Sequence, residues 1–293
     1  MFVFRELARV SRPLYLGLAA LTYVLGTGIA HYLGAFAESG VFWAGLGGTL
    51  LALLSMNLLG EVFRPAGAPP AGRETQTQGI ALRDAALYVS VAALAACGVL
   101  VVILYREGSL GLQPVVSLGL SLLVILAYAI PPVRLMDRGF GELLLAIQIA
   151  YLTPSIGFML QTQKSHRLLD ACIVPLTMLL LATLLALDFA SYADDLKYAR
   201  QSLLARIGWE IAIPLHHGLL NAAYVLLGSA TLLGFSFGLL WPALLTIPFA
   251  VFQYLILRNI ALGGRPIWGL LRANAVTVFG LTTYLLTLSF WMR

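Results

Sequence analysis

The sequence predicts an all-α membrane protein that forms one domain of nine transmembrane helices over residues 1–293. Three observations lead to this prediction. Hydrophobic residues make up 60% of the chain and charged residues only 11%, less than half of the roughly 25% that is usual in a soluble domain. Apolar segments of spanning length recur along the chain, and Lys and Arg collect on one side of them. We therefore expect most of the chain to be embedded in lipid.

The first element is a short segment, residues 1–12, that precedes the first apolar stretch. Arg5, Arg9 and Arg12 are interspersed there with apolar side chains, which is typical of a helix lying in the membrane interface. The charge-free stretch that follows, residues 13–37, is too long for the apolar core of a cleavable signal peptide. Residues 1–12 are therefore predicted to form an interfacial amphipathic segment.

Charge-free windows predict the spans, because a helix needs about 20 apolar residues to cross the hydrocarbon. The windows cover residues 13–37, 39–60, 85–105, 108–133, 143–163, 171–187, 211–257 and 273–292. The window 211–257 is too long for one helix. We predict that it breaks between Leu239 and Pro242, because proline interrupts helices, and this break brings the count to nine.

The cationic residues predict the orientation of the chain. If nine spans alternate in direction, one side of the membrane holds only Arg106, Lys164, Arg167 and Arg293, and the side of the N-terminus holds the other 14 of the 18 Lys and Arg residues. Loops rich in Lys and Arg remain in the cytoplasm. We therefore expect a cytoplasmic N-terminus and a C-terminus on the opposite side. The pI near 9.4 reflects this asymmetry and does not indicate nucleic-acid binding.

Acidic residues gather on the same predicted cytoplasmic side, although the orientation rule does not require this. Ten of the 13 Asp and Glu residues fall there. The two longest loops of that side, residues 61–84 and 188–210, carry charges of both signs. Because loops held by a rigid scaffold commonly carry binding and catalytic residues, we predict that these are the active-site loops.

Polar residues lead from the second span into the first of these loops. Asn57 and Glu61 are spaced i, i+4 and so share a helix face at the membrane edge. Arg64 follows within one turn, and Arg73 lies further along the loop. A solvated helix end with snorkelling side chains is the alternative interpretation.

The second loop begins with acidic residues. Asp188 and Asp195 recur at helical spacing, and Asp194 and Lys197 lie beside them. A carboxylate in the last turn of a span opposes the helix dipole and is costly to desolvate, so we expect a counter-ion. Mg²⁺ with a phosphate is one candidate, because Mg²⁺ commonly binds one or two carboxylates together with substrate oxygens. Cationic side chains are the other.

A third polar cluster follows the fourth span. Tyr128 lies shortly before Pro131 and Pro132, which are predicted to end the helix, and Arg134 follows at the interface. A guanidinium at this position suits a phosphate. An arginine pair that only sets the topology is the alternative.

These segments resemble motifs of the UbiA-type intramembrane aromatic prenyltransferases. Residues 194–208 are similar to the family's second Asp-rich motif with the Lys/Thr and Gly positions that follow it. Residues 128–142 are similar to its Tyr-x-x-Pro-Pro-x-Arg stretch leading to Gly-Glu, and Asn57 lies where its first motif, Asn-Asp-x-x-Asp-x-x-x-Asp, begins. The resemblance covers nearly the whole chain and implies nine helices bundled around a central cavity.

The resemblance also implies a function: transfer of a prenyl group from a polyprenyl diphosphate to an aromatic or other lipophilic acceptor, as in quinone biosynthesis. Mg²⁺ would bridge the two motifs to the diphosphate. The implied roles are metal binding by Asn57, Glu61, Asp188, Asp194 and Asp195, diphosphate binding by Asn57, Arg64, Arg73, Arg134 and Lys197, and catalysis by Asp188, Asp194, Asp195 and Tyr128. The Tyr128 ring would stabilise an allylic cation or orient the acceptor.

The chain departs from this family pattern at several acidic positions. Leu58 and Pro65 occupy two of them in the first motif, Glu61 replaces a third, and Ser191 stands at the middle position of the second motif. Fewer carboxylates weaken metal binding, so we expect the predicted phosphate-binding cations to help neutralise the leaving group. The alternative is a catalytically silent protein of this fold that binds a lipid, quinone or pigment or serves as a subunit of a membrane complex. A transporter is disfavoured, since no charged residue lies near the middle of a span.

Overall fold

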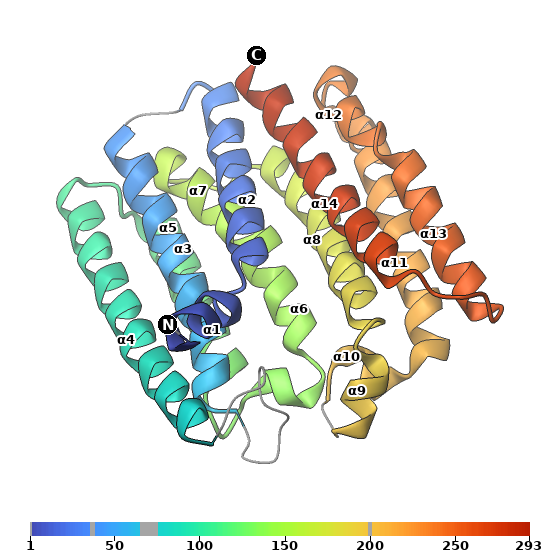
Figure 1. The fold of residues 1–293 in the computed structure, drawn as a ribbon. Coiled ribbons are helices and arrows are strands. Elements are labelled where there is room, and N and C mark those ends of the chain that lie inside the picture. The colour runs from blue at the N-terminus through green and yellow to red at the C-terminus, as the bar shows by residue number, and fades with distance from the viewer. Residues whose placement is uncertain (1, 36–38, 65–75, 199–200) are drawn as a thin grey trace.

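The computed structural model describes residues 2–35, 39–64, 76–198 and 201–293, and every regular element in these ranges is helical (Figure 1). The elements are α1 (Phe2–Val10), α2 (Pro13–Tyr32), α3 (Ser39–Val62), α4 (Gln76–Arg106), α5 (Leu112–Ala129), η1 (Leu135–Arg138), α6 (Gly141–Ala146), η2 (Ile147–Leu152), α7 (Thr153–Thr162), α8 (Arg167–Asp188), α9 (Tyr192–Lys197), α10 (Leu203–Ile207), α11 (Trp209–Ser229), η3 (Ala230–Leu233), α12 (Phe237–Leu244), α13 (Ile247–Ala261) and α14 (Trp268–Trp291).

The predicted number of spans is confirmed for the described ranges. Nine helical segments there are long and apolar enough to cross a membrane. Helix α1 lies across the end of the bundle where α2 begins, and α14 finishes at the opposite end (Figure 1). The protein is therefore an integral membrane protein that crosses the bilayer several times.

The predicted break in the long apolar window is wrong. Leu239 and Pro242 lie inside α12, and the chain turns earlier, at Gly234, so the seventh and eighth spans are Trp209–Leu233 and Phe237–Ala261. Gly234 has φ +89°, a left-handed conformation that glycine adopts without steric cost. Pro242 acts locally instead: α12 ends two residues after it, and α13 resumes the span at Ile247.

One of the two predicted active-site loops is shorter than its sequence suggested. Helix α4 begins at Gln76 rather than at the predicted residue 85, so residues 76–84 of the loop 61–84 are helical. The loop 188–210 contains two short helices, α9 and α10, before α11 starts at Trp209. Polar residues at this end of the bundle therefore extend the helices beyond the apolar windows.

The fifth span is irregular in the middle and packs closely against α2. Its central segment, η2, is a π-helix, followed by Pro154 in the first turn of α7. Thr22 of α2 donates a hydrogen bond to the carbonyl oxygen of Ile149 at 2.7 Å, and a Cβ atom at Gly26 would collide with the carbonyl group of Pro154. These contacts fix the middle of α2 against the fifth span.

Candidate active site at one end of the bundle

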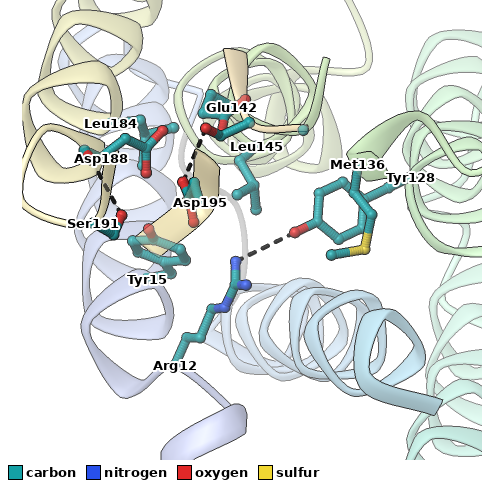
Figure 2. A pocket seen from close by; sticks show the side chains of 12 residues that line it. Arg12, Tyr15, Tyr128, Met136, Glu142, Leu145, Leu184, Asp188, Ser191 and Asp195 are labelled. Atoms are coloured by element: carbon teal, nitrogen blue, oxygen red, sulfur yellow. Dashed lines mark hydrogen bonds between the residues drawn. The ribbon is translucent and has the colours of Figure 1, made fainter. Parts of the chain in front are cut away.

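One cavity collects polar side chains from five parts of the chain. It encloses about 130 Å³ near the ends of α5 and α8 and the beginnings of α2 and α6. Its lining consists of Arg12, Tyr15, Tyr128, Met136, Gly141, Glu142, Leu145, Leu184, Asp188, Ser191, Asp195 and Ser202 (Figure 2). Three of the predicted catalytic residues, Asp188, Asp195 and Tyr128, therefore line the same space.

Three carboxylates form one wall of this cavity. Asp195 Oδ2 accepts a hydrogen bond from the Ser202 hydroxyl at 3.0 Å, and Glu142 Oε2 accepts one from the backbone N–H of Leu203 at 3.1 Å. The Asp188 side chain lies beside that of Glu142. Its Oδ2 atom is buried and has no hydrogen-bond partner among the described residues. Two buried carboxyl groups side by side need a shared proton or a bound cation to offset their charge.

The local fold explains which acidic residues reach the cavity. Helix α8 ends at Asp188, and the N–H of Ser191 donates to the Asp188 carbonyl oxygen at 3.0 Å, which closes a turn before α9. This turn directs Asp195 inward, where it is 5% exposed. Asp194 and Lys197 are exposed on the other face of α9. The cavity thus includes only one member of the adjacent pair Asp194–Asp195.

Facing the carboxylates is a guanidinium held by two tyrosines. Arg12 Nη1 donates to the Tyr128 hydroxyl at 3.2 Å, and the guanidinium lies 5.6 Å from the centre of the Tyr15 ring. Figure 2 shows Arg12 reaching into the cavity from the start of α2. The pKa of Arg12 is raised above its ordinary value, chiefly by electrostatic attraction to the Tyr128 oxygen, although burial opposes this. The cavity therefore contains a permanent cation.

Arg134, a predicted phosphate ligand, has a different environment. It is only 8% exposed, and its guanidinium donates to the carbonyl oxygens of Ala129 at 3.3 Å and Gly60 at 3.2 Å, with Asp137 as a third partner. Arg134 is not among the residues that line the cavity. In this arrangement its hydrogen bonds join the ends of α3 and α5.

The predicted ligands at the end of α3 also lie outside the cavity lining. Glu61 and Arg64 form an ion pair with 3.0 Å between Oε1 and Nη1. Asn57 Nδ2 donates to the backbone carbonyl of Ser11 at 3.0 Å, and its Oδ1 is buried without a hydrogen-bond partner in the described part of the chain. Arg73 lies outside the described residues.

Sequence reasoning missed three lining residues: Arg12, Tyr15 and Glu142. The sequence places Arg12 in the predicted interfacial segment, and Glu142 only ends the stretch 128–142 that resembles a family motif. One signal was present, because Arg12 directly precedes Pro13 and proline favours the first turn of a helix. The sequence could therefore predict a cation at the start of the first span. It could not predict the partner of this cation, because Tyr128 lies 116 residues away.

The donor atoms fit a single divalent cation better than two. No group of three or more His, Cys, Asp or Glu residues in the described ranges is arranged to hold a metal ion without other ligands. Mg²⁺, however, usually takes only one or two carboxylates and completes its shell with water and phosphate oxygens. The unpartnered Oδ2 of Asp188 meets that requirement on the α8 side. On the α3 side, Glu61 is paired with Arg64, and the Oδ1 atom of Asn57, although it has no hydrogen-bond partner among the described residues, lies outside the cavity lining.

Solved structures similar to this chain define its fold. They are structures of a UbiA homolog from Archaeoglobus fulgidus bound to DMAPP and Mg²⁺ (TM-score 0.65, 13% identity), to GPP and Mg²⁺ (0.66, 14%) and to Cd²⁺ (0.62, 16%). Each match covers 96% of this chain and 99% of the other. No protein-family model and no curated protein matches the sequence.

These matches place the chain in a class of all-α membrane proteins with nine spans. Within that class, it has the UbiA-type prenyltransferase fold, as the sequence motifs predicted. The prediction of the fold is therefore confirmed.

Proposed function

We propose that this protein transfers a prenyl group from a prenyl diphosphate to a lipophilic acceptor. The observation that carries the proposal is the joint lining of one cavity by the carboxylate of Asp188, the guanidinium of Arg12 and the ring of Tyr128, at one end of a UbiA-type bundle. Within a single space, the guanidinium can bind an anionic leaving group, the carboxylate can bind a cation, and the ring can contact an aromatic or lipid group.

The polar wall would bind the diphosphate. At about 130 Å³ the cavity has room for a charged head group but not for a long chain. Arg12 would donate hydrogen bonds to phosphate oxygens, which are strong when both partners are charged. Asp188, together with Asp195, would hold Mg²⁺, which when bound neutralises charge on the diphosphate. Glu142 and Ser202 would keep these carboxylates in position.

Transfer then requires cleavage of the bond between the allylic carbon and the diphosphate oxygen. The electron pair of this bond leaves with the diphosphate, whose new negative charge Arg12 would stabilise. The carbon fragment becomes an allylic cation, and the faces of Tyr15 and Tyr128 would stabilise it. The acceptor supplies the electron pair for the new bond and loses a proton, which the released diphosphate would accept.

A second cavity offers space for a lipophilic group. It encloses about 510 Å³ between α3, α4, α5 and α7, and its lining is almost entirely apolar. Ile125 on α5 contributes to this lining and lies one helical turn before Tyr128. We propose that an isoprenoid chain or the acceptor uses this space. We further propose that the polar cavity faces the cytoplasm, in agreement with the distribution of Lys and Arg.

A direct assay tests the function. Purified protein in lipid vesicles is incubated with radiolabelled GPP, Mg²⁺ and lipids extracted from the host membrane as acceptors. We expect labelled lipid and released diphosphate, and we expect Asp195→Ala to abolish both. Product formation by Asp195→Ala at the wild-type rate would exclude this active site.

A second candidate function is supported by the end of α3. Leu58 and Pro65 stand at acidic positions of the family's motif, and Glu61 is paired with Arg64. These features favour a protein that binds a lipid, quinone or pigment without turnover, alone or as part of a membrane complex. Lipids that co-purify with the protein, and remain bound to it when no GPP is present, would support binding without turnover. Labelled product in the assay above would exclude it.

A further inference from the structure

The Arg12 side chain has more hydrogen-bonding capacity than its neighbours use. A guanidinium carries five N–H donors, and the described residues supply one hydrogen-bond partner, the Tyr128 hydroxyl. None of the Arg12 nitrogen atoms is among the buried atoms that lack a partner, so the remaining donors are accessible from the cavity. No ion pair joins Arg12 to Asp188, although the two side chains line the same cavity. The cation is therefore open to a ligand.

The backbone at Arg12 is held in a conformation that arginine seldom adopts. Arg12 has φ 52° and ψ 66°, in the left-handed region, which costs a residue with a Cβ atom of order 1 kcal/mol or more. Such a conformation persists only when surrounding contacts maintain it. Here the chain passes from α1 into Pro13 of α2, and this turn directs the side chain toward the carboxylates (Figure 2).

Asn57 is one of the contacts that maintain this turn. Its side-chain amide donates to the carbonyl oxygen of Ser11, the residue before Arg12, at 3.0 Å. Asn57 is the residue at which the first Asp-rich motif was expected to bind metal. In this chain the same side chain instead supports the backbone that carries a cation.

From this geometry we infer that Arg12 takes the place of one metal ion in the diphosphate site, and that Asn57 positions it. The inference rests on the proposed function and specifies how the site works with a reduced first motif. The carboxylates of α8 and α9 would hold one divalent cation, and Arg12 would supply the positive charge that a second cation supplies when both motifs are acidic. One fixed guanidinium and one Mg²⁺ then share the negative charge of the diphosphate.

Substitution of Arg12 tests this inference through two effects of opposite sign. Removal of a positive charge weakens the binding of an anion and strengthens the binding of a cation by the nearby carboxylates. Arg12→Gln should therefore weaken binding of an unreactive prenyl thiodiphosphate by about tenfold or more, the loss expected for charge-assisted hydrogen bonds. The same variant should bind Mn²⁺ more tightly than the wild type in the absence of the analogue. A purely structural role would weaken both.

Both affinities can be measured on the full-length protein in detergent. Electron paramagnetic resonance counts the bound Mn²⁺, and equilibrium binding of the labelled analogue gives its affinity. We expect one Mn²⁺ per chain in the presence of the analogue. Arg9→Gln is the matched control, because Arg9 also lies on the N-terminal segment but is 61% exposed and paired with Glu6, and it should change neither affinity. Arg12→Lys, which keeps the charge, should change Mn²⁺ affinity least.

The positioning role of Asn57 has its own test. Asn57→Leu removes the hydrogen bond to Ser11 without adding a charge. We expect it to weaken analogue binding in the same direction as Arg12→Gln but by a smaller factor, while wild-type Mn²⁺ affinity is retained or exceeded. If Asn57 were a metal ligand, the variant would instead lose Mn²⁺ affinity.

Several results would overturn the inference. Two Mn²⁺ ions per chain with the analogue, or a fall in both affinities in Arg12→Gln, would show that Arg12 does not replace a metal. The inference would also be overturned if Arg12→Gln bound the diphosphate analogue normally but lost affinity for an aromatic carboxylate. If the wild type fails to bind the analogue, the proposed function fails, and unchanged Mn²⁺ affinity in Arg12→Gln then rejects the role of Arg12 separately.

Discussion

The end of α3 and the end of α8 occupy comparable positions in the predicted motifs but have different environments. At α8, Asp188 and Asp195 face a cavity, and one oxygen of Asp188 is buried without a partner in the described chain. At α3, Glu61 pairs with Arg64, and Asn57 bonds to the backbone before α2. The α8 end therefore lines the polar cavity, whereas the α3 end forms its ion pair and hydrogen bond outside the cavity lining.

This difference teaches that a motif can lose its ligands and still contribute to a site. The α3 end supports Arg12, and the middle of α3 lines the apolar cavity with Gly45, Gly48 and Ala52. Charge comes from α8, α9 and the residue before α2, while α3 contributes packing and apolar space. The predictions below test this division of roles.

Removal of divalent metal should have the largest effect. The carboxylates at the α8 end are proposed to hold one Mg²⁺ ion, and a metal ion stabilises transition-state charge by several kcal/mol. We therefore expect prenyl transfer to fall below detection in EDTA and to return when Mg²⁺ is added. The measurement is the rate of labelled product formation against free Mg²⁺. Full activity in EDTA would mean that cationic side chains alone carry the leaving-group charge, and the α8 end would lose its assigned role.

Replacement of single carboxylates compares the two ends directly. Asp188→Asn should lower kcat by about 100-fold or more, the size of effect seen when a group that stabilises transition-state charge is removed. Glu61→Gln at the α3 end should lower kcat by less than about tenfold, because Glu61 already pairs with Arg64. Rates under saturating donor give both values. Equal losses of kcat in the two variants would indicate that both ends bind metal.

The adjacent pair on α9 provides a sharper control. Asp195→Ala should abolish turnover, whereas Asp194→Ala should change the rate and the stability little, within about 0.5 kcal/mol for an exposed side chain. The two substitutions remove the same chemical group one residue apart, but only Asp195 lines the cavity. Similar activities of the two variants would contradict the orientation of α9.

Arg134 tests the structural role that its hydrogen bonds indicate. Arg134→Gln should destabilise the fold by about 2–4 kcal/mol, because it leaves buried partners of a charged group unpaired. Thermal unfolding in detergent measures this change. Arg138→Gln is the control, since Arg138 donates to the Pro132 carbonyl oxygen at 2.8 Å in an exposed setting. A stable Arg134→Gln variant that fails to bind diphosphate would restore the phosphate-binding prediction.

The apolar cavity should give the smallest effect. Gly98 lines it, and a Cβ atom there would meet nothing within 4 Å, so the side chain of Gly98→Leu can start from the backbone without a clash and occupy part of the cavity. We expect KM for a long-chain donor to rise about tenfold while kcat for DMAPP stays unchanged, since one lost methylene site in an apolar pocket costs about 1–3 kcal/mol. Gly17→Leu, equally unobstructed but outside the cavity, should change neither.

Much of the fold was predictable because lipid imposes a simple rule on sequence. Apolar windows and the sorting of Lys and Arg gave nine spans, and the motif resemblance gave the correct fold. The turn at Gly234 was missed because Pro242 looked like the stronger helix breaker, yet proline in the eighth span only interrupts the helix locally. Windows also ended too early at α4, since they record hydropathy and not helical hydrogen bonds.

The site was predictable only where neighbours in sequence are neighbours in space. Asp188 and Asp195 were found together because one turn joins them, although the inward orientation of Asp195 and the outward orientation of Asp194 depend on that turn. Arg12 was missed because its hydrogen-bond partner, Tyr128, lies far away in sequence on α5. Arg134 resembled a phosphate ligand in sequence, but the carbonyl groups that it contacts come from α3 and α5, and only the fold brings them there.

The close packing of Gly26 on Pro154 has a consequence for the distant end of α2. Gly26 lies 14 residues beyond Arg12, which corresponds to about 21 Å along a helix, and its missing side chain lets α2 lie directly on the backbone of the fifth span. Any larger residue at position 26 would push α2 away from the fifth span. Because a helix moves largely as a rigid body, this shift would displace the Arg12 guanidinium from the three carboxylates. The absence of a side chain at Gly26 therefore helps to set the position of Arg12 at the other end of the same helix.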